Sequence, residues 1–244
     1  MILFIFVPRK KKTEMKDRIK VVAFDADDTL WENQTYFDEA QLKFSRAVTG
    51  YADPEQAQNE LYHTEIRNLD TLGYGVMAFT MSMIETALRL SGDTIPASRI
   101  HEIYNIGREL LKNPATPYPE VEDTLRTIAE TMPYKLIVIT KGNTTDQENK
   151  LERSGLTDFF SHIEIVPDKN EEAYGKIIDV LGIKAEELLM VGNSFKSDIA
   201  PVLKLGGYGV HIPAKSTWQH EVIEEFDHPN LFRISHFREL LDIL

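Results

Sequence analysis

The stretch that decides the fold is IKVVAFDADDTL, residues 19–30. Its first half is apolar and rich in β-branched residues, which predicts a buried strand over residues 19–25. Its second half places the carboxyl groups of Asp25, Asp27 and Asp28 at the end of that strand. Carboxylates so close repel one another and need a cation, a positive side chain or bound protons. A divalent ion such as Mg²⁺ would meet that need, and a merely solvated acidic turn is disfavoured because the strand runs directly into the cluster.

Strand-like and helix-like segments alternate along most of the chain. Further apolar runs between turn residues predict strands at residues 134–140, 162–166, 188–192, 208–212 and, more weakly, 231–234. Helical patterns lie between them, at residues 119–131, 171–181 and 197–205. This alternation predicts an α/β fold, a Rossmann-like doubly wound parallel sheet with helices on both faces. Ligands bind such sheets beyond the carboxyl ends of the strands.

Residues 32–116 break the alternation, because no strand-like run occurs there. Four helices are expected instead, near residues 37–48, 54–70, 75–90 and 96–112. Four such helices can form a bundle with its own core. We therefore expect an N-terminal tail at 1–18, a discontinuous Rossmann-like core at 19–31 and 117–244, and an inserted α-helical cap domain at 32–116.

Composition excludes several functional classes. The formal net charge of −12 gives no general attraction to nucleic acid or anionic membranes, so neither partner is expected. The chain has no cysteine, which excludes disulfides, Cys-ligated metals and a thiol nucleophile. Its first seven residues are apolar but too few to span a bilayer, and the basic run follows them, unlike a secretory signal. We expect a soluble, cytoplasmic protein in which residues 1–14 are a loose tail or precede a start at Met15.

The ends of three later strands carry complementary chemistry. After the second strand, a hydroxyl and glycine-containing backbone at a helix start can donate to an anion, although a threonine there also often caps a helix. These candidate substrate-binding residues are Thr140, Lys141, Gly142 and Asn143. Lys169 follows the third strand, where a lone lysine is more often solvated. The fourth strand runs into GNSFKSD, residues 192–198, whose Asn193 and Asp198 either face the acidic cluster or belong to a helix cap.

Together these segments resemble the four motifs of the haloacid dehalogenase-like hydrolase superfamily, with the insert placed where that family has its first-type cap. The resemblance implies that Asp25 is the nucleophile and forms a phospho-aspartyl intermediate. It implies that Asp27 protonates the leaving oxygen and then activates water. Thr140 and Lys169 would hold the phosphoryl oxygens, and Lys169 would also restrain Asp25. Mg²⁺ would be bound by Asp25, the backbone carbonyl of Asp27, and the loop that holds Asn193 and Asp198.

The function that this resemblance implies is a Mg²⁺-dependent phosphatase of a small phosphorylated metabolite. One departure is Asn193, which stands where the family commonly has aspartate. An amide oxygen can bind a hard cation without adding charge, so we expect looser Mg²⁺ binding, with Asp198 contributing more, directly or through water. Whether Asp27 has a raised pKa is open, because its acidic neighbours would raise it and a metal would lower it.

Two alternatives remain. A 2-haloacid dehalogenase is suggested by Asn193, but that metal-free branch lacks the second acid of the first motif, and displacing a halide leaves no alkoxide for Asp27 to protonate. A catalytically inactive phosphate-binding or receiver-like module also has an acidic cluster, a hydroxyl and a lysine. Receiver domains, however, phosphorylate an aspartate on a later strand and lack so long an insert. Sugar phosphates, phosphoglycolate and nucleoside monophosphates all remain candidate substrates, and the oligomeric state is open.

Overall fold

The computed structural model describes residues 15–244, so residues 1–14 of the tail predicted at 1–18 lie outside the described residues. Within them, six strands form one parallel sheet in the order β3-β2-β1-β4-β5-β6. The strands are β1 (Val21–Phe24), β2 (Lys135–Lys141), β3 (His162–Val166), β4 (Leu188–Gly192), β5 (Tyr208–His211) and β6 (Leu231–Arg233). This order is that of a doubly wound sheet and confirms the predicted Rossmann-like α/β class.

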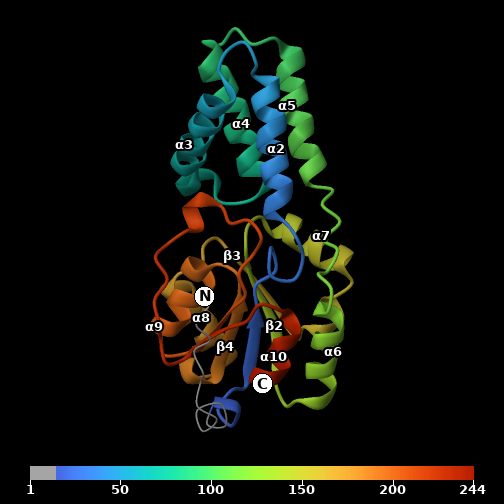
Figure 1. Ribbon diagram of the computed structural model, residues 1–244, viewed down its shortest axis with the longest axis vertical. Coiled ribbons are helices and arrows are strands. Elements are labelled where there is room, and N and C mark those ends of the chain that lie inside the picture. The colour runs from blue at the N-terminus through green and yellow to red at the C-terminus, as the bar shows by residue number, and fades with distance from the viewer. Residues whose placement is uncertain (1–14) are drawn as a thin grey trace.

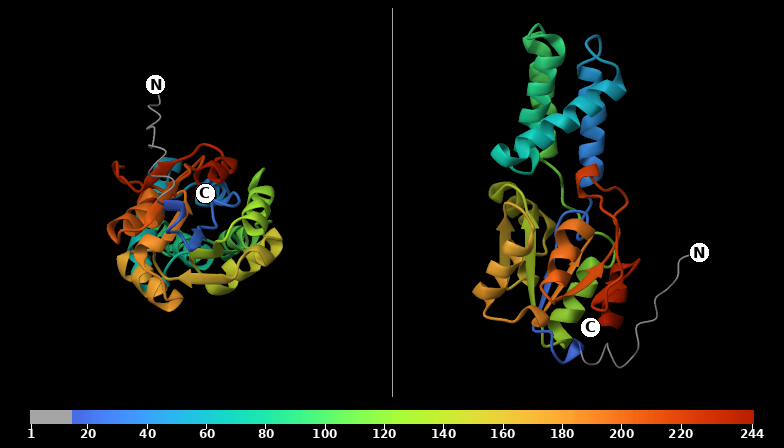
Figure 2. Two further views of the ribbon diagram at one scale, coloured as in Figure 1. Left: turned by 90° about the horizontal axis from the view of Figure 1, so that it is seen from below. Right: turned by 90° about the vertical axis from the view of Figure 1, so that its left-hand side faces the viewer.

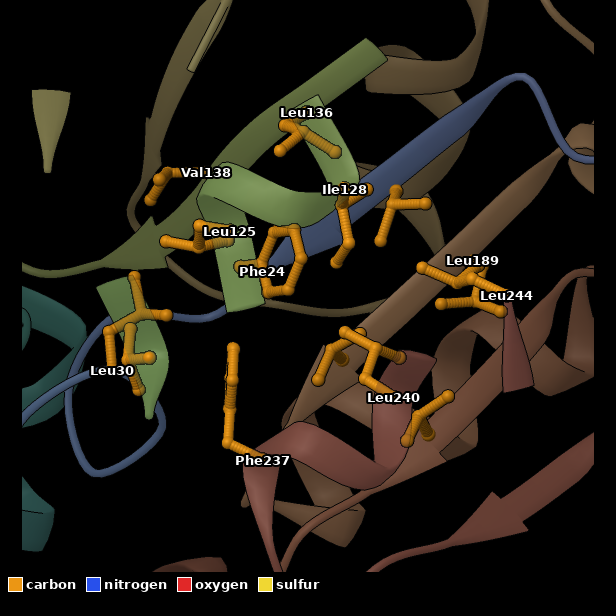
Figure 3. Close-up of a cluster of buried hydrophobic side chains, with 14 of the residues drawn as sticks. Phe24, Leu30, Leu125, Ile128, Leu136, Val138, Leu189, Phe237, Leu240 and Leu244 are labelled. Carbon is orange, nitrogen blue, oxygen red and sulfur yellow. The ribbon is translucent and has the colours of Figure 1, made fainter. Parts of the chain in front are cut away.

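Central strand β1 is buried on both faces of the sheet. Because successive side chains of a strand point to opposite faces, Val22 and Phe24 join one apolar cluster, whereas Val21 and Ala23 join another. Figure 3 shows Phe24 facing Leu125 and Ile128, within the same cluster as the C-terminal Leu240. The two faces are thus both covered, which explains why β1 is a continuous apolar run.

Helices flank the sheet on both sides. The cluster around Phe24 takes side chains from α6 (Val121–Thr131), α7 (Thr144–Ser154) and α10 (Leu240–Ile243). The cluster around Ala23 takes them from α8 (Glu171–Leu181) and α9 (Ala200–Lys204). Short helical turns complete the chain, at Thr157–Phe159, Ala185–Glu187, Phe195–Ile199, Gln219–Glu221 and Phe237–Glu239.

The first four of the helices between β1 and β2 form a separate bundle beyond the carboxyl ends of the strands (Figures 1 and 2). They are α2 (Gln34–Ala47), α3 (Pro54–Leu72), α4 (Val76–Ser91) and α5 (Ala97–Leu110). Each helix contributes a fully buried residue to a core distinct from those of the sheet, and these are Phe44, Leu61, Met83 and Ile103.

The chain crosses between sheet and bundle twice, and the two crossings lie side by side. The Tyr118 N–H donates to the carbonyl of Leu30 at 2.8 Å, and the Asn113 side-chain amide donates to the carbonyl of Glu32 at 3.3 Å. Asp28, a member of the acidic triplet, accepts from the backbone N–H groups of Asn33 and Gln34, each at 2.9 Å. Its carboxyl group therefore holds the start of α2.

The sequence predicted the strands to within two residues at each end, with differences elsewhere. Helix α7 was not delimited, and the helix predicted at 197–205 is a π-helical turn over Phe195–Ile199 followed by α9. The side chain of Met15 is fully buried in the cluster around Phe24, so the chain joins this core before residue 19. Among residues 15–244, no helix is long and apolar enough to cross a membrane.

Close packing of α4 against α5 depends on Gly107, because a β-carbon there would lie 1.9 Å from the Thr80 hydroxyl oxygen. Thr80 cannot simply turn away, since its own β-carbon would be 2.8 Å distant and its hydroxyl donates to the Val76 carbonyl. We expect Gly107→Ala to lower the free energy of unfolding by about 1–3 kcal/mol, the usual cost of overpacking.

The matched control is Gly175→Ala in α8, where a β-carbon meets no atom within 4 Å. That change should raise stability by about 0.5–1 kcal/mol, because alanine favours the helix interior. Urea denaturation followed by circular dichroism measures both. Equal effects of the two substitutions would contradict this account of the helix contact.

Candidate functional site

The site lies where the carboxyl ends of β1, β2 and β4 meet. Phe24 is level with Val138 on one neighbouring strand and with Val191 on the other, so the residues just beyond them converge. They line a cleft of about 170 Å³ between the sheet edge and the helical bundle. The predicted site residues that line it are Asp25, Asp27, Thr140, Lys141, Lys169, Asn193 and Asp198. Gly142 and Asn143 are not among the lining residues.

Lys169 joins two buried carboxylates. Its Nζ atom donates to Asp25 Oδ1 at 2.5 Å and to Asp198 Oδ1 at 2.7 Å. Asp25 also accepts from the Thr29 hydroxyl at 2.9 Å. The lack of a side chain at Gly192 leaves room for the Asp198 carboxyl group, because a β-carbon at Gly192 would lie 2.3 Å from Asp198 Oδ2. The lysine that the sequence could not distinguish from a solvated one is therefore in direct contact with Asp25.

Burial is the largest single influence on the pKa values of both Asp25 and Lys169. Burial raises the pKa of Asp25, and the nearby carboxylate of Asp198 raises it further, while Lys169 opposes the rise. Although burial by itself lowers the pKa of Lys169, the two aspartates outweigh it and hold that pKa above its usual value. Lys169 thus stays charged and keeps two carboxylates together.

Asp27 is held by three donors. Lys150 Nζ lies 2.8 and 2.6 Å from its two carboxylate oxygens, Gln147 Nε2 donates at 2.9 Å and Trp31 Nε1 at 2.8 Å. Burial alone would raise the pKa of Asp27, but attraction to Lys150 and these hydrogen bonds lower it. The acidic neighbours of Asp27 alone would raise its pKa. Lys150 on α7 outweighs them, so the pKa is lowered instead.

The Asn193 side chain lies beside three oxygen atoms that could also bind a cation. With its NH₂ group turned toward them, its side chain lies 3.1 Å from Asp25 Oδ2, 3.2 Å from the backbone oxygen of Asp27 and 3.1 Å from the Thr29 hydroxyl. Helix capping at this loop falls instead to Ser194, whose hydroxyl accepts from the N–H of Ser197 at 3.0 Å. The Asn193 side chain therefore does not cap this helix and can contact the other site residues.

The donor set fits a divalent metal ion. The cleft holds the carboxylates of Asp25, Asp27 and Asp198. Lys150 pairs with Asp27, and Lys169 pairs with both Asp25 and Asp198. Within residues 15–244, no three His, Cys, Asp or Glu side chains form a metal-binding cluster. The ligands would instead be mixed oxygens, the carboxylate, carbonyl and amide type that Mg²⁺ accepts. A cation bound there would take the place that the Asn193 NH₂ group can also fill.

The end of β2 and the two residues that follow it differ in what they offer to the cleft. The Thr140 hydroxyl lines the cleft, whereas the N–H of Gly142 donates to the Val166 carbonyl and Asn143 caps α7 by accepting from Asp146. These partners explain why the two residues predicted to bind substrate, Gly142 and Asn143, lie outside the lining.

Lys141 is engaged by residues that sequence reasoning did not select. Its ammonium donates to Glu221 at 2.5 Å and lies 4.1 Å from the centre of the Tyr74 ring. Although burial would raise the pKa of Glu221, Lys141 lowers it to about 2. Glu221 and Trp218 come from the segment after β5, which carries no motif, and Tyr74 comes from the turn between α3 and α4. The bundle and the sheet thus meet over the cleft.

Comparison with known proteins identifies the family. The family model described as haloacid dehalogenase-like hydrolase matches residues 19–206. The chain belongs to this family. A crystal structure of a haloacid dehalogenase-like family hydrolase from Xanthomonas campestris is 37% identical, with a TM-score of 0.80, and the match covers 89% of this chain and 87% of that one.

Two curated relatives carry the name glyceraldehyde 3-phosphate phosphatase. The one from Methanopyrus kandleri is 28% identical over 93% of this chain and 97% of its own length. The one from Methanocaldococcus jannaschii is 29% identical over the same shares. The similarity therefore spans the bundle as well as the sheet.

Removing Lys169 tests its role between the carboxylates. Lys169→Met should lower the free energy of unfolding by about 3–5 kcal/mol in metal-free buffer near pH 8, because two buried charges lose their partner. The folded-state pKa of Asp25, which burial already raises, then lies further above its unfolded value, so the deficit relative to the unsubstituted protein should shrink as the pH falls. Urea denaturation between pH 5 and 8 measures this.

The matched control is Lys176→Met, which removes an exposed lysine paired with Glu172 on α8 and should change stability little. A Lys169→Met deficit that grows toward low pH would contradict the assigned repulsion.

Proposed function

We propose that this protein is a Mg²⁺-dependent phosphatase that hydrolyses a small phosphorylated metabolite through a phospho-aspartyl intermediate on Asp25. The proposal rests on one cleft, lined by Asp25, Asp27 and Thr140, in which the buried Lys169 donates to Asp25. We take residues 19–31 and 117–244 as the catalytic core and residues 32–116 as the cap.

In the proposed first step, a carboxylate oxygen of Asp25 attacks phosphorus, the bond to the leaving oxygen breaks, and that oxygen takes a proton from Asp27. In the second step, Asp27 removes a proton from water, whose oxygen attacks phosphorus and releases Asp25 and inorganic phosphate. Lys150 holds Asp27 ionised, which suits the second step. We infer that the first step requires Asp27 to gain a proton and separate from Lys150.

The phosphoryl group carries negative charge toward an already acidic cleft. Thr140 and Lys169 would hold its oxygens. Asp25, the backbone oxygen of Asp27, and Asn193 or Asp198 would hold Mg²⁺, which supplies positive charge against the repulsion between carboxylate and phosphate. The names of the relatives make glyceraldehyde 3-phosphate the first substrate to test.

The nucleophile is tested by Asp25→Asn. Phosphate release from glyceraldehyde 3-phosphate and p-nitrophenyl phosphate should require Mg²⁺, and the substitution should lower kcat on the order of 10⁴-fold or more, as loss of a covalent nucleophile does elsewhere. A colorimetric phosphate assay measures it, with circular dichroism to verify folding.

Asp123→Asn, an exposed aspartate on α6, is the control and should leave the rate unchanged. The proposal fails if neither ester is hydrolysed, or if Asp25→Asn retains the activity of the unsubstituted protein.

A second candidate, hydrolysis of a 2-haloacid, is favoured by the Asn193 amide, which can stand where a cation would. Against it, Asp27 has no alkoxide to protonate when a halide leaves. Chloride release from 2-chloropropionate in the presence of EDTA would support this candidate and contradict the phosphatase.

Metal affinity is tested by Asn193→Asp. A unit charge at 4 Å contributes about 4 kcal/mol at an effective dielectric constant of 20, so after dehydration costs we expect Mg²⁺ to bind about tenfold or more tightly. In EDTA the variant should have a lower Tm, since a carboxylate replaces an amide beside Asp25, and added Mg²⁺ should raise its Tm more than that of the unsubstituted protein.

Thermal unfolding across a Mg²⁺ titration measures this without any substrate. Asn230→Asp, distant in sequence and outside the cleft lining, controls for a general effect of added charge. Identical Mg²⁺ responses in Asn193→Asp and the unsubstituted protein would show that residue 193 does not contact the metal.

A further inference from the structure

Glu65 is a carboxyl group of the bundle that faces the cleft without a partner. It lies on α3 and lines the cleft, and its Oε2 atom is buried with no hydrogen bond to the described residues. None of the ion pairs formed within residues 15–244 includes it. The acids of the sheet edge differ in this respect, because Asp25 and Asp27 are each held by a lysine.

Burial favours the protonated, neutral form of Glu65. Burial raises its pKa to about 8, and no charged residue contributes to or opposes that shift. A protonated carboxyl group donates one hydrogen bond and also accepts, which complements a hydroxyl group. Its protonated form can also donate to a carbonyl oxygen.

The bundle side of the cleft, over the residues that the structure describes, offers no positive charge to a second anion. Among the cleft-lining residues that the described bundle contributes, none is Lys, Arg or His. The apolar ones include Phe37, Leu69 and Phe79, and the polar ones include Gln41 and Ser82. A carboxylate or second phosphate that binds against the bundle would be desolvated without a counter-charge, which is costly. Uncharged oxygen atoms meet no such penalty.

We propose that Glu65 is a specificity-determining residue that binds the hydroxyl or carbonyl oxygen of an uncharged substrate chain, at the end remote from the phosphate. This inference rests on the proposed phosphatase function and narrows its substrates. It favours phosphorylated polyols and hydroxyaldehydes over phosphorylated carboxylic acids, and it assigns the bundle a chemical role in addition to covering the cleft.

The test compares kcat/KM for four monoesters of similar size, which are glycerol 3-phosphate, propyl phosphate, 3-phosphoglycerate and O-phosphoethanolamine. The unsubstituted protein should prefer glycerol 3-phosphate over propyl phosphate by about ten- to a hundredfold, because propyl phosphate leaves buried polar groups unpaired. It should also prefer glycerol 3-phosphate over 3-phosphoglycerate and O-phosphoethanolamine.

Two variants separate hydrogen bonding from charge. Glu65→Leu should reduce the preference for glycerol 3-phosphate over propyl phosphate to within about threefold of unity, since only the lost hydrogen bond distinguished the two esters. Glu65→Gln, which keeps a donor and an acceptor without charge, should retain most of the preference. Circular dichroism and thermal unfolding verify that both variants fold as the unsubstituted protein does.

Glu39→Leu, an exposed glutamate on α2 that does not line the cleft, is the matched control and should leave every ratio unchanged. If Glu65→Leu keeps the ratio of the unsubstituted protein while phosphatase activity persists, this inference is wrong and the proposed function stands. A preference for O-phosphoethanolamine that Glu65→Gln abolishes would instead indicate an ionised Glu65 and also overturn it. Absence of activity toward these four esters, glyceraldehyde 3-phosphate and p-nitrophenyl phosphate would overturn both proposals.

Discussion

Repulsion among buried carboxylates at the end of β1 is the constraint on which the rest of the site depends. Asp25, Asp27 and Asp198 are brought together by adjacent strands and loops, and each is stable there only because an ammonium group lies within hydrogen-bonding distance. Lys169 serves two of them and Lys150 the third. The two lysines come from opposite faces of the sheet, the first from just before α8 and the second from α7. The helices that bury the sheet therefore also deliver the charge that the acidic motif requires.

Much of this arrangement could be predicted from the sequence because it depends on local rules. Apolar runs bounded by turn residues located the strands, and parallel pairing then placed Asp25, Thr140 and the loop after Gly192 at one edge. The break in strand–helix alternation located the bundle. These features follow from side-chain periodicity and from the direction of strands, both of which are present in a single sequence.

The partners of the motif residues could not be predicted in this way. Lys150 and Gln147 lie one helical turn apart on α7, a polar segment whose bounds the sequence did not mark, and their approach to Asp27 depends on how that helix packs. The pKa of Asp27 is consequently lowered by a contact with Lys150, which lies 123 positions later in the chain. Glu221 likewise reaches Lys141 from a segment without regular pattern. Long-range pairing of this kind has no local signal.

Separate apolar cores in the sheet and the bundle have a consequence for how this protein can change over evolutionary time. Phe24 packs within one core, and Phe44, Leu61, Met83 and Ile103 pack within another. A substitution on the inner surface of the bundle can therefore alter what the cleft admits without disturbing the strand that carries Asp25. Drift in α3 and α4 offers a route to new substrates, while the chemistry at the end of β1 is inherited unchanged.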